Sequence, residues 1–335
     1  MRPKSTVPPT LADVASACSV SLATVSKALS PHADRCDLNP ATRERIVAMA
    51  QQLGWSRNRR RSARARRQWH NIGVLWGYKV PQFVSYEHVG DALAGILGER
   101  FRVLITPVPE ANDWRELQGS LRLDGVIVLG QVREAIIADL DAKQYPAVLV
   151  NMETDRQLHQ ILVNDVEGTT ALTAHLLGLG HRRIVYLRNE WEPGHYSERD
   201  RLAAVRQTVA AAGAHLDEVR GRLFDDVVAH CRAGATAVIC HNYSDVADMR
   251  SALREAGLAV PRDVSLGGCH ELSWFRHMDP PITSVAIPLR EMAEVGARLL
   301  LELMSGKGED APLRQVLPET LTVRASTGPV CVRKA

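Results

Sequence analysis

Apolar positions change their spacing along the chain near residue 70. Before that point they recur three and four residues apart, as Leu11, Val14 and Ala15 do, which is the spacing of one face of a short helix. Beyond it, unbroken apolar runs such as IGVLW, which starts at Ile72, alternate with stretches of helical spacing. Such runs are typical of strands that are buried on both faces of a parallel sheet. The pattern predicts a small helical N-terminal part followed by a larger α/β part.

Three short helices are predicted before residue 56. Thr10 is the expected N-cap of the first, Ser21 caps the second after a turn at Ser19, and Asn39 followed by Pro40 starts the third. In the second helix the positions expected to face inward are Leu22, Val25, Ala28 and Leu29, and the outward positions are Ala23, Thr24, Ser26 and Lys27. Two short helices joined by a tight turn and braced by a third make a helix-turn-helix, whose second helix fits the DNA major groove. A three-helix bundle with a polar surface has the same pattern and stays open.

The rest of the chain alternates between strand and helix. Strands are expected at 72–76, 101–106, 124–130, 146–151, 183–188, 236–242 and 264–268, and helices at 89–97, 133–140, 168–179, 199–212 and 245–256. This alternation predicts two doubly wound parallel-sheet lobes, with a ligand crevice at the carboxyl ends of the strands. The late segments PPITSVAIP and PETLTVRAS are expected to cross back between the lobes. The expected fold class is α/β, with a small all-α headpiece and a two-lobed body.

Charge is divided unevenly between these two parts. Residues 1–70 hold thirteen Lys and Arg against four Asp and Glu, a net charge of +9, whereas the whole chain of 335 residues carries +3. Residues 71–335 therefore carry −6. A basic head on an acidic body is typical of a module that meets nucleic-acid phosphates while its partner domain does not. A solvated basic tail is the alternative explanation, but such a tail would not need the ordered helical pattern predicted for these residues.

Composition narrows the class of protein further. Hydrophobic residues make up 45% of the chain and charged residues 24%, as in globular proteins, and no apolar run is long enough to cross a bilayer. The first residues lack the apolar core of a signal peptide, so a cytoplasmic location without membrane contact is expected, in which the six cysteines stay reduced. None of them forms a C-x-x-C pair, so no metal site, disulfide framework or other cofactor is expected.

Two stretches of the headpiece carry a resemblance to a known family. TLADVASACSVSLATVSKAL and NPATRERIVAMAQQLGW are similar, without gaps, to the DNA-binding headpiece of the lactose/galactose-repressor (LacI/GalR-type) family of bacterial transcription regulators. GHRRI, VPRDVS and PPITSV resemble the effector-binding core of the same family. The resemblance implies a homodimeric regulator, more often a repressor, that binds a pseudo-palindromic operator in double-stranded DNA under the control of a small molecule.

The same resemblance divides the chain into parts. It implies a helix-turn-helix headpiece at 1–56, an arginine-rich hinge at 57–70, and a two-lobed effector-binding and dimerisation domain, similar to periplasmic binding proteins, at 71–330. Lobe 1 is expected at about 71–165 plus 288–318, and lobe 2 at about 166–285 plus 319–330.

Positions that contact DNA also follow from the resemblance. Leu22, Ala23 and Lys27 stand where the family reads bases, although arginine is more usual at position 27 and lysine lacks its bidentate fork. The whole expected DNA-binding set is Thr10, Ser21, Leu22, Ala23, Thr24, Ser26, Lys27, Asn58, Arg59, Arg61 and Arg64. Where the family hinge has a leucine wedge, this chain has the arginine run RNRRRSARARRQ. Arginines that enter a narrow minor groove and a flexible charged linker both fit that run and stay open.

Candidate effector contacts lie in the body. Arg201 matches the family arginine that forks onto ligand hydroxyls or carboxylates, and Asn242 matches the asparagine of an Asn-Asp pair whose aspartate is here Tyr243. His270 and Asn151 stand where aspartates commonly bind sugar hydroxyls. The full expected set is Asn151, Arg201, Asn242, His270, Trp274 and Trp191, the tryptophans serving as stacking surfaces for a sugar face. A sugar or sugar acid is the expected effector, and a carboxylate would suit Arg201 with His270.

Other functions fit less of the sequence. The chain has no G-x-G-x-x-G, G-x-x-x-x-G-K-[ST], G-x-S-x-G or H-E-x-x-H motif, so an enzyme is not expected. Cys240-His241 and Cys269-His270 are adjacent pairs whose members point to opposite faces of a strand, so four ligands would not converge on a metal. A regulator without a small-molecule response and a DNA-acting enzyme such as a recombinase stay as alternatives. A free solute-binding protein would lack the basic head.

Overall fold

A computed structural model describes most of the chain. The described residues are 11–29, 38–53, 70–77, 90–93, 95–98, 101–107, 114, 116–117, 123–188, 194–306 and 311–330. The chain separates into two compact units, one of residues 1–68 with 301–308 and one of residues 69–300 with 309–335. No helix in the described ranges combines the length and the apolar character that crossing a bilayer requires.

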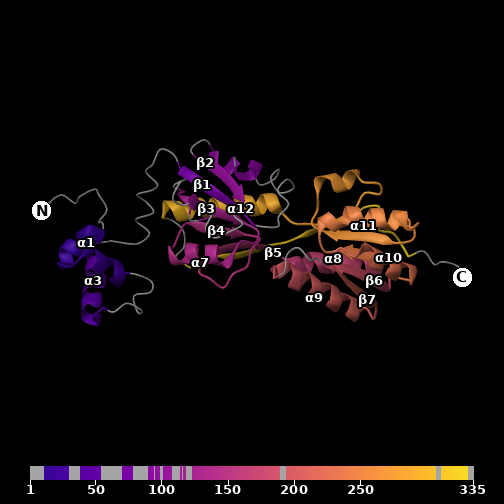
Figure 1. Cartoon of the computed structure of the whole chain (residues 1–335), viewed down its shortest axis with the longest axis horizontal. Helices are drawn as coiled ribbons and strands as arrows, with labels where there is room; N and C mark the ends of the chain where they lie inside the picture. The colour runs from indigo at the N-terminus through magenta and orange to yellow at the C-terminus, as the bar shows by residue number, and fades with distance from the viewer. Residues whose placement is uncertain are drawn as a thin grey trace. The chain divides into compact units, whose positions relative to one another are not determined.

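The described part of the headpiece contains three helices, α1 Leu11–Cys18, α2 Leu22–Ala28 and α3 Pro40–Gln52 (Figure 1). One side chain from each helix is fully buried in their shared core: Val14, Val25 and Ile46. The predicted caps of α2 and α3 are confirmed, because the side chain of Ser21 accepts the Thr24 backbone N–H and that of Asn39 accepts the Ala41 N–H. Each cap accepts a backbone N–H group in the first turn of its helix, where that group has no partner within the helix.

The first sheet of the larger unit is all parallel. Its strands are β1 His70–Trp76, β2 Phe101–Pro107, β3 Gly125–Leu129, β4 Ala147–Val150, β5 His159–Val163 and β11 Arg314–Leu317, in the order β11-β5-β4-β3-β1-β2. Helix α7, Glu134–Ala142, packs Ile136 and Leu140 against the strand face that bears Val126 and Leu149. Helix α12, Leu289–Ser305, approaches β4 at Gly296, where a Cβ would lie 3.1 Å from Val150 Cγ2. Because side chains alternate along β4, α7 and α12 cover opposite faces.

The second sheet is also mostly parallel, with one antiparallel strand at its edge. Its strands are β6 Arg183–Arg188, β7 His215–Arg220, β8 Ala237–Cys240, β9 Ser265–Cys269, β10 Thr283–Ala286 and β12 Thr320–Thr322, in the order β12-β10-β9-β8-β6-β7, and only β12 runs antiparallel. Helices α8 Asp165–Gly178 and α9 Tyr196–Ala211 cover one face, and α10 Phe224–Arg232 and α11 Tyr243–Glu255 cover the other (Figure 1). A short 3₁₀ helix, η3 Ser273–His277, follows β9.

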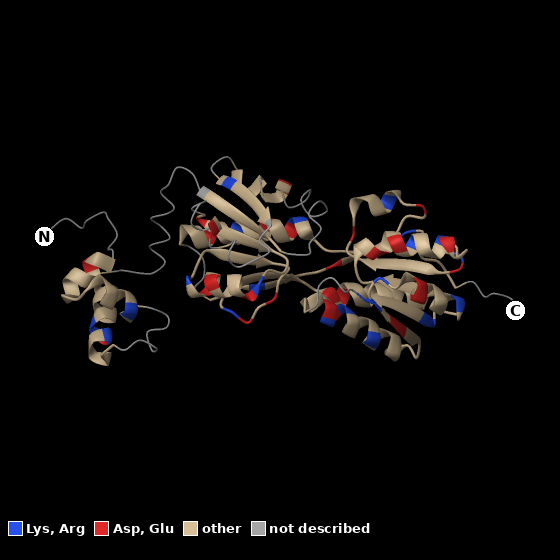
Figure 2. Cartoon of the chain, viewed as in Figure 1, with Lys and Arg blue, Asp and Glu red and all other residues tan. Residues whose placement is uncertain are grey.

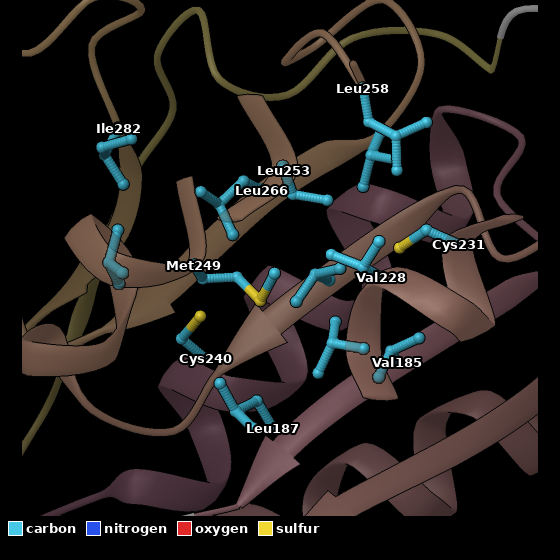
Figure 3. Packing of buried hydrophobic residues seen from close by; sticks show 14 of the residues in the cluster. Val185, Leu187, Val228, Cys231, Cys240, Met249, Leu253, Leu258, Leu266 and Ile282 are labelled. Atoms are coloured by element: carbon cyan, nitrogen blue, oxygen red, sulfur yellow. The ribbon is translucent and has the colours of Figure 1, made fainter. Parts of the chain in front are cut away.

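The core under α10 and α11 is formed mainly by aliphatic and sulfur-containing side chains (Figure 3). Val185 and Leu266 from the sheet face Val228 of α10 and Met249 of α11, and all four are at most 5% exposed. Cys240 lies in the same cluster as a free, buried thiol. Burial of this kind removes apolar surface from water and supplies the main favourable contribution to folding.

Among the described elements, the chain passes between the two sheets three times. It leaves β5 for α8, leaves β10 for α12, and leaves β11 for β12. The second and third passages use the two late segments that were expected to cross. The predicted fold class is confirmed, whereas the finer lobe boundaries stay a prediction. Strands β5, β7 and β11 were not foreseen.

Candidate functional site

Helix α2 presents a small polar face to the outside of the headpiece. Ala23, Ser26 and Lys27 are exposed on it, while Val25 and Ala28 are buried against α1 and α3. The turn before the helix is tight because Ser19 has a left-handed φ of 51°, and Arg45 of α3 donates to the Cys18 carbonyl at 3.3 Å. Short exposed side chains on a rigidly held helix are suited to close approach to a groove.

One expectation for this helix is wrong. Leu22 was expected to face inward, but it is 53% exposed, because the first residue of α2 projects beyond the small core formed by the three helices. Its exposure places it on the same face as Ala23, with which the family resemblance had already grouped it. The remaining candidate DNA contacts, Thr10, Asn58, Arg59, Arg61 and Arg64, lie outside the described residues.

The larger unit contains a cavity of about 380 Å³ between its two lobes. Its wall consists of Gln131, Met152, Glu153, Arg188, Gly194, His195, Tyr196, Glu198, Arg199 and Leu202. The first three follow β3 and β4 of the first sheet, Arg188 ends β6 of the second, and the rest lie at the start of α9. The cavity therefore opens at the carboxyl ends of strands from both sheets, and its volume is within the range of about 300–1,000 Å³ typical of small-molecule sites.

Asn151 joins the two lobes beside this cavity. Its carbonyl accepts the Nε2–H of His195 at 2.9 Å, and its side-chain oxygen accepts the Tyr196 hydroxyl at 2.7 Å. Nδ1 of His195 accepts the Ser197 backbone N–H, which fixes the tautomer with the proton on Nε2. The Tyr196 oxygen also accepts the Val163 N–H at 3.2 Å. Burial raises the pKa of Tyr196, so the hydroxyl stays a donor.

The charged side chains of the cavity wall are arranged in pairs. Arg199 donates to Glu153 at 3.1 Å, from the second lobe to the first, and Arg188 lies 3.3 Å from Glu198. Burial opposes ionisation of Glu153, but the hydrogen bonds from Arg314 and Arg199 outweigh it and lower its pKa. Both signs of charge are interspersed over both lobes (Figure 2).

Arg201 lies in a second, buried ion cluster behind the cavity. Its Nε donates to Asp165 Oδ1 at 2.5 Å, its Nη1 donates to the His241 carbonyl at 2.9 Å, and its Nη2 lies 3.6 Å from Glu319 Oε1. The Arg201 side chain is 6% exposed and both carboxyl groups are 0% exposed. Asp165 and Glu319 stand on two of the three passages between the lobes, so the cluster ties these passages to α9.

Glu319 in this cluster has a raised affinity for protons. Burial, with the Asp165 carboxylate alongside, raises the pKa of Glu319 to about 8 despite the nearby Arg201. Gly168 provides the space, because a Cβ there would collide with the Glu319 carboxyl group. Glu319 therefore carries a proton at neutral pH, and Arg201 is balanced mainly by Asp165.

Three of the sequence-predicted effector residues lie close together: Arg201 donates to the carbonyl of His241, which precedes Asn242, and its charge acts on His270. Of the six, none is in the cavity wall among the described residues, although Asn151 directly precedes Met152 of that wall. Asn242 precedes α11, and Trp274 is 40% exposed on η3. His270 has a left-handed φ of 76°, and burial lowers its pKa to about 3, so its ring is neutral. Trp191 lies outside the described residues. For all six, effector contact stays a prediction.

Sequence reasoning missed the residues that form the cavity wall. Glu153, Arg188 and Glu198 each lie at the end of a strand or in the first turn of a helix, where a crevice was expected. Their position after the strands was a usable signal. Their pairing was not, because it joins residues of different elements and, for Glu153 with Arg199, of different lobes.

Comparison with known proteins agrees with this architecture. Residues 10–58 match bacterial regulatory proteins of the lacI family, and residues 173–327 match the periplasmic binding protein-like domain. The chain belongs to the lacI family. It is therefore a DNA-binding transcription regulator and not an enzyme.

Relatives of this lacI-family regulator align along nearly its whole length. The HTH-type transcriptional repressor MelR of Bacillus subtilis (strain 168) is 28% identical over 338 residues, which cover 94% of this chain and 96% of MelR. The probable HTH-type transcriptional repressor ExuR of the same organism is 25% identical over 315 residues, covering 88% and 92%. The solved transcriptional regulator CelR-cellobiose complex is 26% identical, covers 95% of this chain and 99% of that one, and superimposes with a TM-score of 0.67.

Proposed function

We propose that this regulator represses transcription as a homodimer and that a small molecule, a sugar or a sugar derivative, bound between the lobes controls its affinity for DNA. The observation that carries the proposal is the cavity at the strand ends of both lobes in a chain that also has an exposed helix-turn-helix face. A ligand in that cavity contacts both lobes at once, so it favours one lobe arrangement over another. CelR, solved with cellobiose, is similar along the whole chain and supports a sugar as the ligand class.

The DNA-reading part of the proposal rests on α2. Ser21, Leu22, Ala23, Thr24, Ser26 and Lys27 are the proposed contacts in the major groove, with Lys27 reaching a base edge or a phosphate. Two headpieces of one dimer, one helical turn apart, would read the two halves of a pseudo-palindrome. The proposed division into headpiece 1–56, hinge 57–70 and body 71–330 supplies one such reader per subunit.

Selection of bound fragments from random duplex DNA by the full-length protein tests the DNA part. We expect a two-fold symmetric site at near-physiological salt, and sedimentation of a dimer at micromolar concentration. A single asymmetric half-site, or a persistent monomer, would contradict the dimeric reader. Binding without any consensus, lost steeply as salt rises, would mean that only non-specific attraction to phosphates remains.

A regulator that does not respond to small molecules is the second candidate. The inter-lobe bridge of His195 and Tyr196 to Asn151 favours it, because these contacts hold the lobes together without a ligand. Measuring release from the selected operator in the presence of a sugar panel separates the two candidates. Release by at least one compound supports the controlled regulator, and unchanged binding with all of them supports the unresponsive one.

A further inference from the structure

Both arginines of the cavity wall are paired with carboxylates of the protein itself. Arg199 is engaged by Glu153 and by Asp200, and Arg188 by Glu198 and by Glu218. Each guanidinium group thus has two carboxylate partners, of which one faces the cavity. An anionic ligand would therefore meet a carboxylate already in place beside each of these arginines.

Arg201, which is buried behind the wall, is also occupied by partners within the protein. Arg201 gives its Nε–H to Asp165 and one Nη–H to the His241 carbonyl, and its third nitrogen faces Glu319. His270, the other side chain expected to meet a carboxylate, has a neutral ring. Arg188 and Arg199 of the described cavity wall and Arg201 behind it are therefore all already paired with carboxylates of the protein.

The same wall does offer hydrogen-bonding groups of both kinds. Glu153 and Glu198 come from opposite lobes and, held by their arginines, present oxygen atoms that accept bonds. The Nε–H of Arg188 is buried and makes no hydrogen bond within the described part of the chain, so one donor is left over beside Glu198. A hydroxyl group is both a donor and an acceptor, so it can satisfy a carboxylate and an N–H together.

We propose that the effector is an uncharged polyhydroxy compound, read by Glu153 from one lobe and Glu198 from the other, and that sugar acids are excluded. This inference rests on the proposed function, since it specifies the ligand of the same cavity. An acid would place its carboxylate beside those of Glu153 and Glu198, where like charges repel each other in a partly desolvated site. An amino sugar would place its ammonium group beside Arg188 and Arg199, where like charges also repel each other.

Calorimetric titration of the full-length protein with matched sugars tests the charge class. The probes are glucose, glucuronate and glucosamine, then galactose, galacturonate and galactosamine, and finally cellobiose with cellobionate. We expect the neutral member of at least one series to bind at least tenfold more tightly than its charged counterparts. Tighter or equal binding of an acid or an amine overturns the inference and leaves the proposed function standing. Binding of no probe, with operator binding intact, counts against small-molecule control itself and overturns the inference with it.

Variants at the two glutamates test the residue assignment. Glu153→Gln and Glu198→Gln are each expected to weaken binding of the best neutral compound about tenfold and to narrow its advantage over the matching acid. Glu134→Gln is the control, because Glu134 also pairs with an arginine, Arg156 of the first lobe, but does not line the cavity. Operator affinity and thermal unfolding midpoint report folding in each variant. Unchanged sugar affinity in both folded cavity variants would overturn the assignment of these residues.

Discussion

Two arginines of α9, only two residues apart, lie in opposite surroundings. Arg199 is 62% exposed at the rim of the cavity, where it pairs with Glu153 and Asp200. Arg201 is 6% exposed and pairs with Asp165 beside Glu319. Two positions on a helix differ by about 200° around its axis, so the two side chains leave α9 on opposite sides. One arginine meets solvent at the rim of the cavity, and the other meets the passages between the lobes.

Ion pairs of similar geometry contribute differently to stability depending on their burial. An exposed pair is screened by water and contributes little to stability. A buried pair has already lost its hydration, so removing one partner leaves a bare charge in an apolar setting. Arg201 is thus expected to matter first for folding, and Arg199 first for the ligand.

The largest effect is expected from Arg201→Met. The substitution leaves Asp165 charged and without its cation, and buried pairs broken in this way typically cost about 3–5 kcal/mol. Denaturant unfolding of the full-length protein measures the free energy. If the variant instead keeps its stability and loses only its response to the effector, then Arg201 is a ligand contact, as the family resemblance implies, and the buried cluster does not support the fold.

Glu319→Gln tests whether Glu319 of the same cluster is protonated in the folded protein at neutral pH. The folded-state pKa of about 8 lies above the ordinary 4.5, so this group's stabilisation is complete below about pH 4.5 and is lost as the pH rises through 8. Glutamine keeps the shape and never ionises. Relative to the parent protein, the variant should gain up to about 1.4 kcal/mol per pH unit between pH 6.5 and 8, and then level off.

Three buried histidines titrate outside this window. Burial lowers the pKa values of His181, His241 and His270, so their titration lies below it. Glu255→Gln, at an exposed position of α11, is the control and should show no such slope. Parallel stability curves for the Glu319 variant and the parent from pH 6.5 to 8 would show that Glu319 is already ionised there.

The contrast between the two arginines also marks the limit of sequence reasoning. The alternation of short apolar runs with helical stretches was enough to predict two doubly wound lobes and the three headpiece helices, because burial on both faces leaves a local pattern. Arg201 was recognised as important from its motif, but Asp165 and Glu319 lie 36 and 118 positions away, and nothing local points to them. Strand β11 was missed for a similar reason: Arg314 and Gln315 give an edge strand a polar pattern that resembles a loop.

Tyr196→Phe probes the bridge between the lobes. It removes the hydroxyl that bonds Asn151 and leaves the Val163 N–H without this acceptor, a loss of about 1–2 kcal/mol in the free energy of unfolding. Because the bond joins two lobes, the operator affinity should change as well. Tyr186→Phe, which loses a hydroxyl bonded to His241 within one lobe, is the matched control and should change stability alone. Equal effects of both variants on operator binding would show that the bridge has no part in control.

Arg199→Met repeats the first substitution two residues away, where the smallest loss of stability is expected. Its partners Glu153 and Asp200 remain accessible to water, and exposed pairs are typically worth about 0.2–1 kcal/mol. The free energy of unfolding should therefore fall by less than about 1 kcal/mol, while the affinity for a neutral sugar falls because Glu153 loses the guanidinium that orients it from the other lobe. A loss of stability as large as that of Arg201→Met would remove the distinction between the two sites, since it would mean that the cavity rim holds the lobes together as firmly as the buried cluster does.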